Sequence, residues 1–185
     1  CPRGTYSTET GADSIDACLS CEAGSYQDVE GQTSCKRCDK GYYQNNTGST
    51  LCLPCGSGTY SSLAGSSECL QCKPGTYQSG TGEDTCFECA DGYFQSDFGA
   101  SSCKLCSAGN YCSKTVENPC PQGTYNNITG KTSIDDCVQC PVGTYSTETG
   151  ASSIEACLSC EAGSYQNEVG QTSCERCDKG YYQNN

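Results

Sequence analysis

Cysteine pairs separated by two residues recur along the whole sequence, and cysteine has the widest chemical scope of the residue types present. The pairs Cys18-Leu-Ser-Cys21 and Cys35-Lys-Arg-Cys38, separated by thirteen residues, are typical. Paired cysteines of this spacing occur in zinc sites, in redox-active thiol pairs and in structural disulfide frameworks. Each chemistry needs a different setting, which the rest of the sequence must supply.

The sequence favours structural disulfides over zinc or redox chemistry. A four-thiolate zinc site is the sharpest alternative, but in a continuous array every pair would have to be shared or skipped, and the chain contains no histidine. Redox catalysis needs one low-pKa thiol at a helix N-terminus, whereas this chain has many similar cysteine pairs in segments that we predict to be loops. Without histidine, Ser–His and Cys–His mechanisms are excluded. We therefore predict no metal, no cofactor and no enzyme activity, and we interpret carboxylates such as Asp135 and Asp136 as solvated turn residues.

The composition makes a disulfide framework necessary for folding. Leu, Ile, Val and Phe total 19 of 185 residues and the formal net charge is −12, which alone would describe a disordered chain. The 21 cysteines reverse this expectation, because covalent closures replace the missing apolar core. Closing a loop of about 15 residues removes unfolded-state entropy worth about 3 kcal/mol. Disulfides at this density persist in an oxidising compartment, so we predict an extracellular protein, secreted or on the cell surface.

Short tandem repeats position the cysteines, and we count each repeat from the second cysteine of a pair. Three residues after this starting cysteine lies a glycine, the first glycine, and five residues after it lies Tyr or Phe. The first glycine predicts a turn with positive φ or a close approach of other backbone. The starting cysteines of repeats 1 to 11 are Cys1, Cys21, Cys38, Cys55, Cys72, Cys89, Cys106, Cys120, Cys140, Cys160 and Cys177.

A second glycine precedes the cysteine that closes most repeats. It lies four residues before that cysteine in short repeats, as Gly31 does in repeat 2, and seven before it in the longer repeats 1, 8 and 9. The longer repeats contain an isoleucine (Ile15, Ile134 and Ile154) that we expect to add some packing. No segment shows helical periodicity, so we predict short strands around the Gly-x-Tyr segments, turns and almost no helix.

The repeats fall into three segments. Residues 1–105 hold six tandem repeats, residues 106–119 form an atypical repeat with the extra Cys112, and residues 120–185 hold further repeats. The atypical repeat has no cysteine pair before Cys120. It is the one place where we expect a kink or a boundary.

The simplest disulfide connectivity closes each repeat on itself, from its starting cysteine to the first cysteine of the next pair. Cys177 is then left over, with a partner expected beyond this sequence, which explains the odd cysteine count. A crossed scheme, such as Cys35–Cys52 with Cys38–Cys55, stays open as the alternative because sequence cannot settle connectivity. The local scheme predicts Cys1–Cys18, Cys21–Cys35, Cys38–Cys52, Cys55–Cys69, Cys72–Cys86, Cys89–Cys103, Cys106–Cys112, Cys120–Cys137, Cys140–Cys157 and Cys160–Cys174.

Two acceptor sequons for N-glycosylation, at Asn45 and Asn127, agree with an extracellular location. Both asparagines lie seven residues after a starting cysteine, so their glycans would project from equivalent turns. The acidic balance argues against nucleic acid as a partner, and no apolar run is long enough to span a bilayer. We predict covalent glycans, and self-association or sister fibre proteins as partners.

The recurring motif Cys-x-x-Gly-Thr-Tyr, the glycine before the closing cysteine and the Cys-x-x-Cys joint resemble the ephrin-receptor-like cysteine-rich repeat. That repeat is itself similar to tumour-necrosis-factor-receptor and EGF-like modules. The motif occurs at residues 1–6, 72–77, 120–125 and 140–145, and the resemblance covers the chain except residues 106–119. It implies a disulfide-rich extracellular fold. Proteins that look like this include receptor ectodomains and, in protists and algae, surface-coat, adhesive or flagellar-hair (mastigoneme-like) glycoproteins.

These observations predict a small disulfide-rich repeat fold, an elongated rod of modules of about 17 residues that contact only their neighbours. Residues 140–185 duplicate residues 1–46 at an offset of 139, with 39 of 46 positions identical, so we expect the native protein to continue in both directions. Such a regular surface lets identical chains make identical contacts. We predict an extracellular structural glycoprotein, the repeat segment of a filament or of a surface hair or coat. The alternative is the stalk of a cell-surface receptor or adhesin whose binding domain lies outside these residues.

Overall fold

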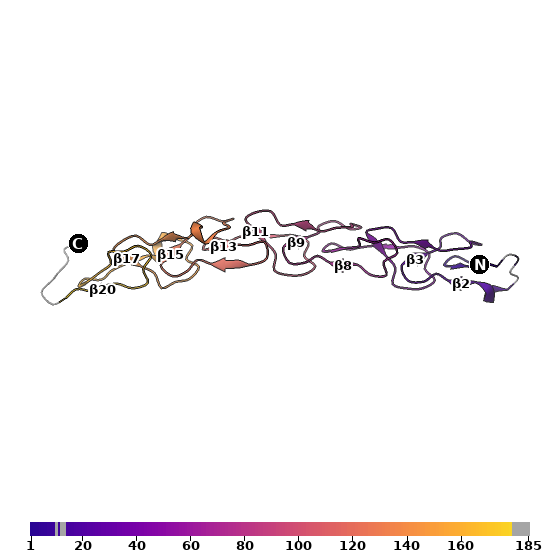
Figure 1. Cartoon of the computed structure of the whole chain (residues 1–185), viewed down its shortest axis with the longest axis horizontal. Helices are drawn as coiled ribbons and strands as arrows, with labels where there is room; N and C mark the ends of the chain where they lie inside the picture. Colours follow the sequence, from indigo (N-terminus) through magenta and orange to yellow (C-terminus); the bar gives the residue numbers. More distant parts are fainter. Residues whose placement is uncertain (10, 12–13, 179–185) are drawn as a thin grey trace. The chain divides into compact units, whose positions relative to one another are not determined.

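The computed structural model describes residues 1–9, 11 and 14–178, and this part folds into ten two-stranded antiparallel sheets and three 3-10 helices (Figure 1). Each sheet pairs a strand near the start of a repeat with a strand near its end, which confirms the predicted fold class. The strands are β1 (Thr5–Tyr6), β2 (Leu19–Ser20), β3 (Ser25–Tyr26), β4 (Lys36–Arg37), β5 (Tyr42–Tyr43), β6 (Leu53–Pro54), β7 (Thr59–Tyr60), β8 (Leu70–Gln71), β9 (Thr76–Tyr77), β10 (Phe87–Glu88), β11 (Tyr93–Phe94), β12 (Lys104–Leu105), β13 (Asn110–Cys112), β14 (Glu117–Pro119), β15 (Thr124–Tyr125), β16 (Val138–Gln139), β17 (Thr144–Tyr145), β18 (Leu158–Ser159), β19 (Ser164–Tyr165) and β20 (Glu175–Arg176). The 3-10 helices are η1 (Ile15–Ala17), η2 (Ile134–Asp136) and η3 (Ile154–Ala156).

A tight turn begins the repeats, and it needs a glycine. In repeat 2 the backbone N–H of Ser25 donates to the carbonyl of Glu22 at 3.0 Å, and Gly24 between them has a φ of +81°. A turn of this kind requires positive φ at its third position, which glycine adopts without a Cβ penalty. The first glycines from Gly4 to Gly163 all have φ between +77° and +85°, which confirms the predicted turn.

Disulfides and buried polar side chains fill the interior of the repeats, and aliphatic side chains do not. The starting cysteines from Cys21 to Cys140 are at most 1% exposed. Every Leu, Ile and Val side chain of the chain is at least 39% exposed. Phe94 is the exception among the larger apolar residues, since it is buried beside Cys106 and Cys112. The fold therefore depends on covalent closure and hydrogen bonding more than on apolar burial.

The extra residues of the longer repeats form a 3-10 turn at the surface. Ser14, Ser133 and Ser153 cap η1, η2 and η3, because each side chain accepts a hydrogen bond from the backbone N–H two residues on. The isoleucine after each serine is 52–70% exposed, so our expectation that it adds packing is wrong. The serine cap, and not an apolar contact, stabilises this turn. No helix in the part of the chain that the structure describes is long and apolar enough to cross a bilayer.

The chain divides into two compact units, and the division does not fall at the atypical repeat. One unit contains Cys1–Glu88 and Asp97–Cys103, and the other contains Cys89–Ser96 and Lys104–Asn185. The division therefore runs through repeat 6, whose two halves belong to different units. The atypical repeat lies wholly within the second unit.

Candidate functional site

The disulfides close the repeats on themselves, as in the local scheme. Cys21 bonds to Cys35 with a Cα–Cα distance of 5.7 Å, and Cys89 and Cys103 are both in disulfides. Cys177 is the free cysteine among the described residues, and it is half-buried. The other disulfides are Cys1–Cys18, Cys38–Cys52, Cys55–Cys69, Cys72–Cys86, Cys106–Cys112, Cys120–Cys137, Cys140–Cys157 and Cys160–Cys174.

Cysteines held in disulfides have no thiolate to offer a metal or a substrate. Three potential ligand atoms converge among the described residues, from Cys106, Cys112 and Glu117. The two cysteines are joined to each other, and Glu117 Oε1 accepts a hydrogen bond from the backbone N–H of Ser107 at 2.8 Å. This cluster therefore serves to close the atypical repeat.

Backbone hydrogen bonds join each repeat to the next in a fixed pattern. Between repeats 2 and 3, the Gly24 N–H donates to the Gln44 carbonyl at 2.7 Å, and the Gln27 N–H donates to the Ser49 carbonyl at 3.0 Å. In return, the second glycine of repeat 3, Gly48, donates to the carbonyl of the starting cysteine of repeat 2 at 2.8 Å. The same three bonds recur between repeats 1 and 2, 3 and 4, 4 and 5, 7 and 8, 8 and 9, and 9 and 10.

The first glycine of a repeat also meets the second glycine of the repeat two further on. A Cβ added to Gly24 of repeat 2 would lie 2.1 Å from the carbonyl oxygen of Gly65 in repeat 4. Arg37 Cδ lies 3.3 Å from the place of a Cβ on Gly65, so the loop rests on this side chain. Equivalent glycine contacts are Gly4 with Gly48, Gly41 with Gly82, Gly58 with Gly99, Gly92 with Gly130, Gly109 with Gly150, and Gly123 with Gly170.

These glycine contacts correct our expectation that repeats contact only their neighbours. Two turns without Cβ atoms approach until their backbones touch, so a repeat is held both by the next one and by the one after it. The repeating interface is therefore the functional candidate of this chain.

The residue six positions after the starting cysteine, here called the inner residue, is buried in repeats 1 to 10 and polar in all of these except the atypical repeat, and the sequence analysis missed it. Gln27 is 2% exposed; its Nε2 donates to the Ser34 carbonyl at 2.7 Å, and its Oε1 accepts from the Val29 N–H at 3.1 Å. One side-chain amide is thereby hydrogen-bonded to both sides of the loop. A signal existed, because the residue after the aromatic is Ser, Gln or Asn in every repeat except the atypical one. The same pair of bonds is made by Gln44, Gln78 and Gln166.

Replacing Gln27 by alanine is expected to loosen the loop of repeat 2. The change leaves the Ser34 carbonyl and the Val29 N–H without their partner at a part-buried place, which costs about 1–3 kcal/mol. In amide hydrogen exchange, the Val29 amide should exchange about 5- to 150-fold faster. The matched control is Gln32→Ala, which removes one 3.4 Å bond of an exposed amide and should leave Val29 unchanged. Equal exchange in the two variants would contradict the role given to the inner residue.

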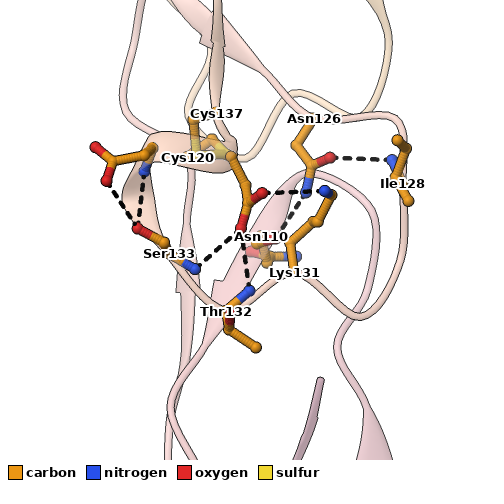
Figure 2. Close-up of polar contacts among 10 residues, drawn as sticks. Asn110, Cys120, Asn126, Ile128, Lys131, Thr132, Ser133 and Cys137 are labelled. Carbon is orange, nitrogen blue, oxygen red and sulfur yellow. Dashed lines mark hydrogen bonds and ion pairs between the residues drawn. A yellow bond between two sulfur atoms is a disulfide. The ribbon is translucent and has the colours of Figure 1, made fainter. Parts of the chain in front are cut away.

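A polar cluster surrounds η2 in repeat 8 (Figure 2). Asp136 Oδ2 accepts hydrogen bonds from the backbone N–H groups of Ser133 at 3.1 Å and Thr132 at 3.3 Å, while its Oδ1 pairs with the Lys131 ammonium at 3.0 Å. The hydrogen bond from Lys131 is the largest cause that lowers the pKa of Asp136. Asp136 is a partly exposed turn residue, as we interpreted it, but its carboxylate also completes a capping box, which we did not predict.

The cluster around Asp136 should weaken in acid. Because folding lowers the pKa of this carboxyl, its contribution is fully present above the unfolded value of about 3.9 and is lost as the pH falls through the lower folded value. Exchange of the Thr132 and Ser133 amides, corrected for intrinsic rates, should therefore speed up only below about pH 4. The Asp136→Asn variant cannot pair with Lys131 in this way and should lack the step. A step of equal size in the variant would assign it to another group.

Both sequon asparagines lie at the surface beside a buried amide. Asn45 and Asn127 are exposed and follow the inner residues Gln44 and Asn126. In each case the inner amide oxygen accepts the backbone N–H of the middle sequon residue at 3.0 Å. Asn126 also donates from Nδ2 to the Asn110 carbonyl of the preceding repeat at 2.9 Å, as Figure 2 shows. The two sequons are therefore presented in the same way.

The atypical repeat keeps these connections although it has no second glycine. Cys112 occupies the inner position, is 3% exposed, and donates its N–H to the Lys131 carbonyl of repeat 8 at 2.8 Å. From repeat 6, the Gln95 N–H donates to the Lys114 carbonyl at 2.9 Å. A short disulfide therefore takes the place of the buried polar side chain, and the hydrogen-bond pattern continues through residues 106–119.

The spacing of cysteines, glycines and aromatics that builds this interface is also the pattern of a known family. The family model described as tyrosine-protein kinase ephrin type A/B receptor-like matches residues 13–50, 30–67, 75–117, 109–157 and 154–185. The chain belongs to this ephrin-receptor-like family. Each match spans parts of three successive repeats, the same reach over which first and second glycines meet. The matches also extend over the atypical repeat, which our resemblance had left out. Among curated proteins, none matches the chain.

Proposed function

We propose that this ephrin-receptor-like chain is an extracellular structural glycoprotein, the repeat segment of a filament or of a surface hair or coat. The observation that carries the proposal is the recurring set of backbone hydrogen bonds between successive repeats. Tension along the chain is shared by three such bonds at an interface, and a disulfide limits how far each repeat can extend. The hydrogen bonds that connect successive repeats are thus made by the backbone itself.

The use of the buried polar groups supports a structural role. Every buried side-chain nitrogen and oxygen atom in the described residues has a hydrogen-bond partner. The inner amides and the disulfides are committed to closing loops, so they hold the fold and are not poised for chemistry.

The surface offers regular points of lateral contact. Tyr60 lies opposite Leu70 in the sheet of β7 and β8, and Tyr77 lies opposite Phe87 in that of β9 and β10, with ring centroids 6.1 Å apart. Leu70 and Phe87 are 51% and 54% exposed. Apolar pairs repeated in this way give identical chains identical places to touch.

Location and glycosylation follow the same reasoning. The family and the number of disulfides support a place outside the cell or on its surface, where an oxidising environment keeps the bonds closed. Glycans on the exposed Asn45 and Asn127, together with a net charge of −12, would keep the surface hydrated.

Electron microscopy of the native material, before and after treatment with a strong thiol, tests the proposal. Ordered filaments that fray or dissolve on reduction are the expected result. Separate rods that carry a distinct head, with no filaments, would overturn the proposal in favour of a receptor or adhesin stalk. This second function is kept as the alternative because the matching family model is described as receptor-like.

A further inference from the structure

The disulfides divide the described residues into closed loops and the links between them. A peptide bond cut inside a closed loop leaves the chain joined, because the disulfide still connects the two sides. A cut in a link separates the chain. Most links are the two residues inside a Cys-x-x-Cys pair, but residues 113–119, here called the long link, are seven residues between the Cys106–Cys112 and Cys120–Cys137 disulfides.

The long link contains an exposed turn with a lysine. Residues 113–116, with the sequence Ser-Lys-Thr-Val, connect β13 to β14 and are all exposed. Repeats 5, 6, 8 and 9 are described on either side of this turn, so its exposure is a property of the interior of the array. Exposed turns of small and polar residues are preferred sites of proteolytic cleavage.

The length of the long link distinguishes its lysine from the other basic residues. A protease cleaves a locally opened chain, which must lie extended in its cleft. Seven residues can open and reach about 24 Å, whereas Lys36, Arg37 and Lys104 lie in links of two residues with a disulfide at each end. Four further basic residues lie inside closed loops, namely Arg3, Lys40, Lys73 and Lys131.

Non-covalent contacts hold the long link in place. The Lys114 carbonyl accepts the Gln95 N–H at 2.9 Å, and Glu117 Oε1 accepts the Ser107 N–H at 2.8 Å. β14 also pairs with β13 along three residues. Hydrogen bonds of this kind open locally, so the long link can detach while the Cys106–Cys112 disulfide keeps the rest of the repeat closed.

We propose that the long link is a processing site, at which an extracellular protease specific for lysine hydrolyses the bond between Lys114 and Thr115. Water adds its hydroxyl group to the Lys114 carbonyl carbon and a proton to the Thr115 nitrogen, and the C–N bond between them breaks. The two products share no disulfide, so one cut divides the oxidised chain. The inference goes beyond the proposed structural role, because the same cut would shorten a filament or release part of a stalk.

Limited digestion of the oxidised chain with trypsin tests the site. The products are separated in denaturant, without and with a reductant, and identified by mass spectrometry. Without the reductant, the first division should yield residues 1–114. Pieces cut after Lys73 or Lys131 should separate only after reduction, because a disulfide joins them. A cut after Arg176 trims the C-terminal end of the second piece only.

Two lysine variants identify the bond that is cut. Lys114→Gln should slow the division by a factor of about ten or more, because the only basic residue of the long link is then gone. The matched control is Lys73→Gln, which makes the same change inside a closed loop and should leave the rate of division unchanged.

A variant outside the cleaved bond tests the local opening. Glu117→Gln replaces the charged acceptor of the Ser107 N–H by a neutral one, so the long link should open more often and the division should run about fivefold faster. The cut after Lys73 should keep its rate. An unchanged division in this variant would contradict the opening on which the cut depends.

Three further results would overturn the proposal. These are an oxidised chain that trypsin does not divide, a first division after Lys36, Arg37 or Lys104, and equal rates of division in the wild type and in Lys114→Gln. None of them bears on the micrographs of the native material, which decide the structural role separately.

Discussion

Reduction of the disulfides should unfold the whole chain under conditions in which the oxidised chain stays folded. A closed loop with a separation of 14 residues contributes about 3 kcal/mol in the chain-entropy model. Several such loops together exceed the total stability of an ordinary domain, about 5–15 kcal/mol. The described residues contain no aliphatic core that could hold the fold once the disulfides are reduced, because every Leu, Ile and Val side chain is exposed.

Alkylation with mass spectrometry and amide hydrogen exchange measure this unfolding together. Without a reductant the alkylating reagent should reach Cys177 alone, and after reduction it should reach all 21 cysteines. Slow exchange of amides such as Gly24, which donates across an interface at 2.7 Å, should disappear at the same time. Protection that survives full reduction would contradict the view that covalent closure replaces a core.

The substitution Gly58→Ala should disrupt the packing of repeats 4 and 6 far more than substitution of a glycine whose added Cβ would meet nothing. An alanine Cβ would lie 2.0 Å from the Gly99 carbonyl oxygen, and backbone cannot swing aside as a flexible side chain can. Strain of this kind, added to the cost of a positive φ, amounts to about 3 kcal/mol or more. The Gly99 amide, which donates to the Cys72 carbonyl at 2.8 Å, should exchange about 100-fold faster.

The matched control for this substitution is Gly31→Ala. Gly31 has a similar φ of +69°, but an added Cβ meets nothing within 4 Å, so only the backbone penalty of about 1 kcal/mol applies. The difference between the two variants isolates the glycine contact from the turn. Equal effects would show that the turn, and not the contact two repeats away, explains the first glycines.

Features set by spacing within one repeat could be predicted from the sequence. The turn at Gly24 and a short strand at Tyr26 were predicted from the Gly-x-Tyr motif, and the Cys21–Cys35 closure belongs to one of the two pairing schemes that the sequence left open. Over so short a distance few backbone conformations are possible. A motif that recurs in every repeat indicates which of them the chain adopts.

Features that depend on what meets across repeats could not be predicted. The sequence around Gly24 does not indicate that it touches Gly65, 41 residues later. The positive φ of each glycine in its own turn already explains why a glycine occupies the position. The inner residues were overlooked because we expected buried side chains to be apolar. Gln27 is buried although it is polar, because its side-chain amide is hydrogen-bonded within the loop. Asp136 looked like any acidic turn residue, since its partners Lys131 and Ser133 become neighbours only through the 3-10 turn.

The central claim is that disulfides limit the extension of each repeat while the interfaces carry the load. Single-molecule stretching of the chain, before and after a thiol is added, tests it most directly. Before the thiol, the chain should lengthen only through its Cys-x-x-Cys links and through residues 113–119, which lie between the Cys106–Cys112 and Cys120–Cys137 disulfides. After the thiol, it should lengthen in discrete steps of about 45 Å, the length hidden in a loop of 14-residue separation. Full extension without the thiol would contradict the account.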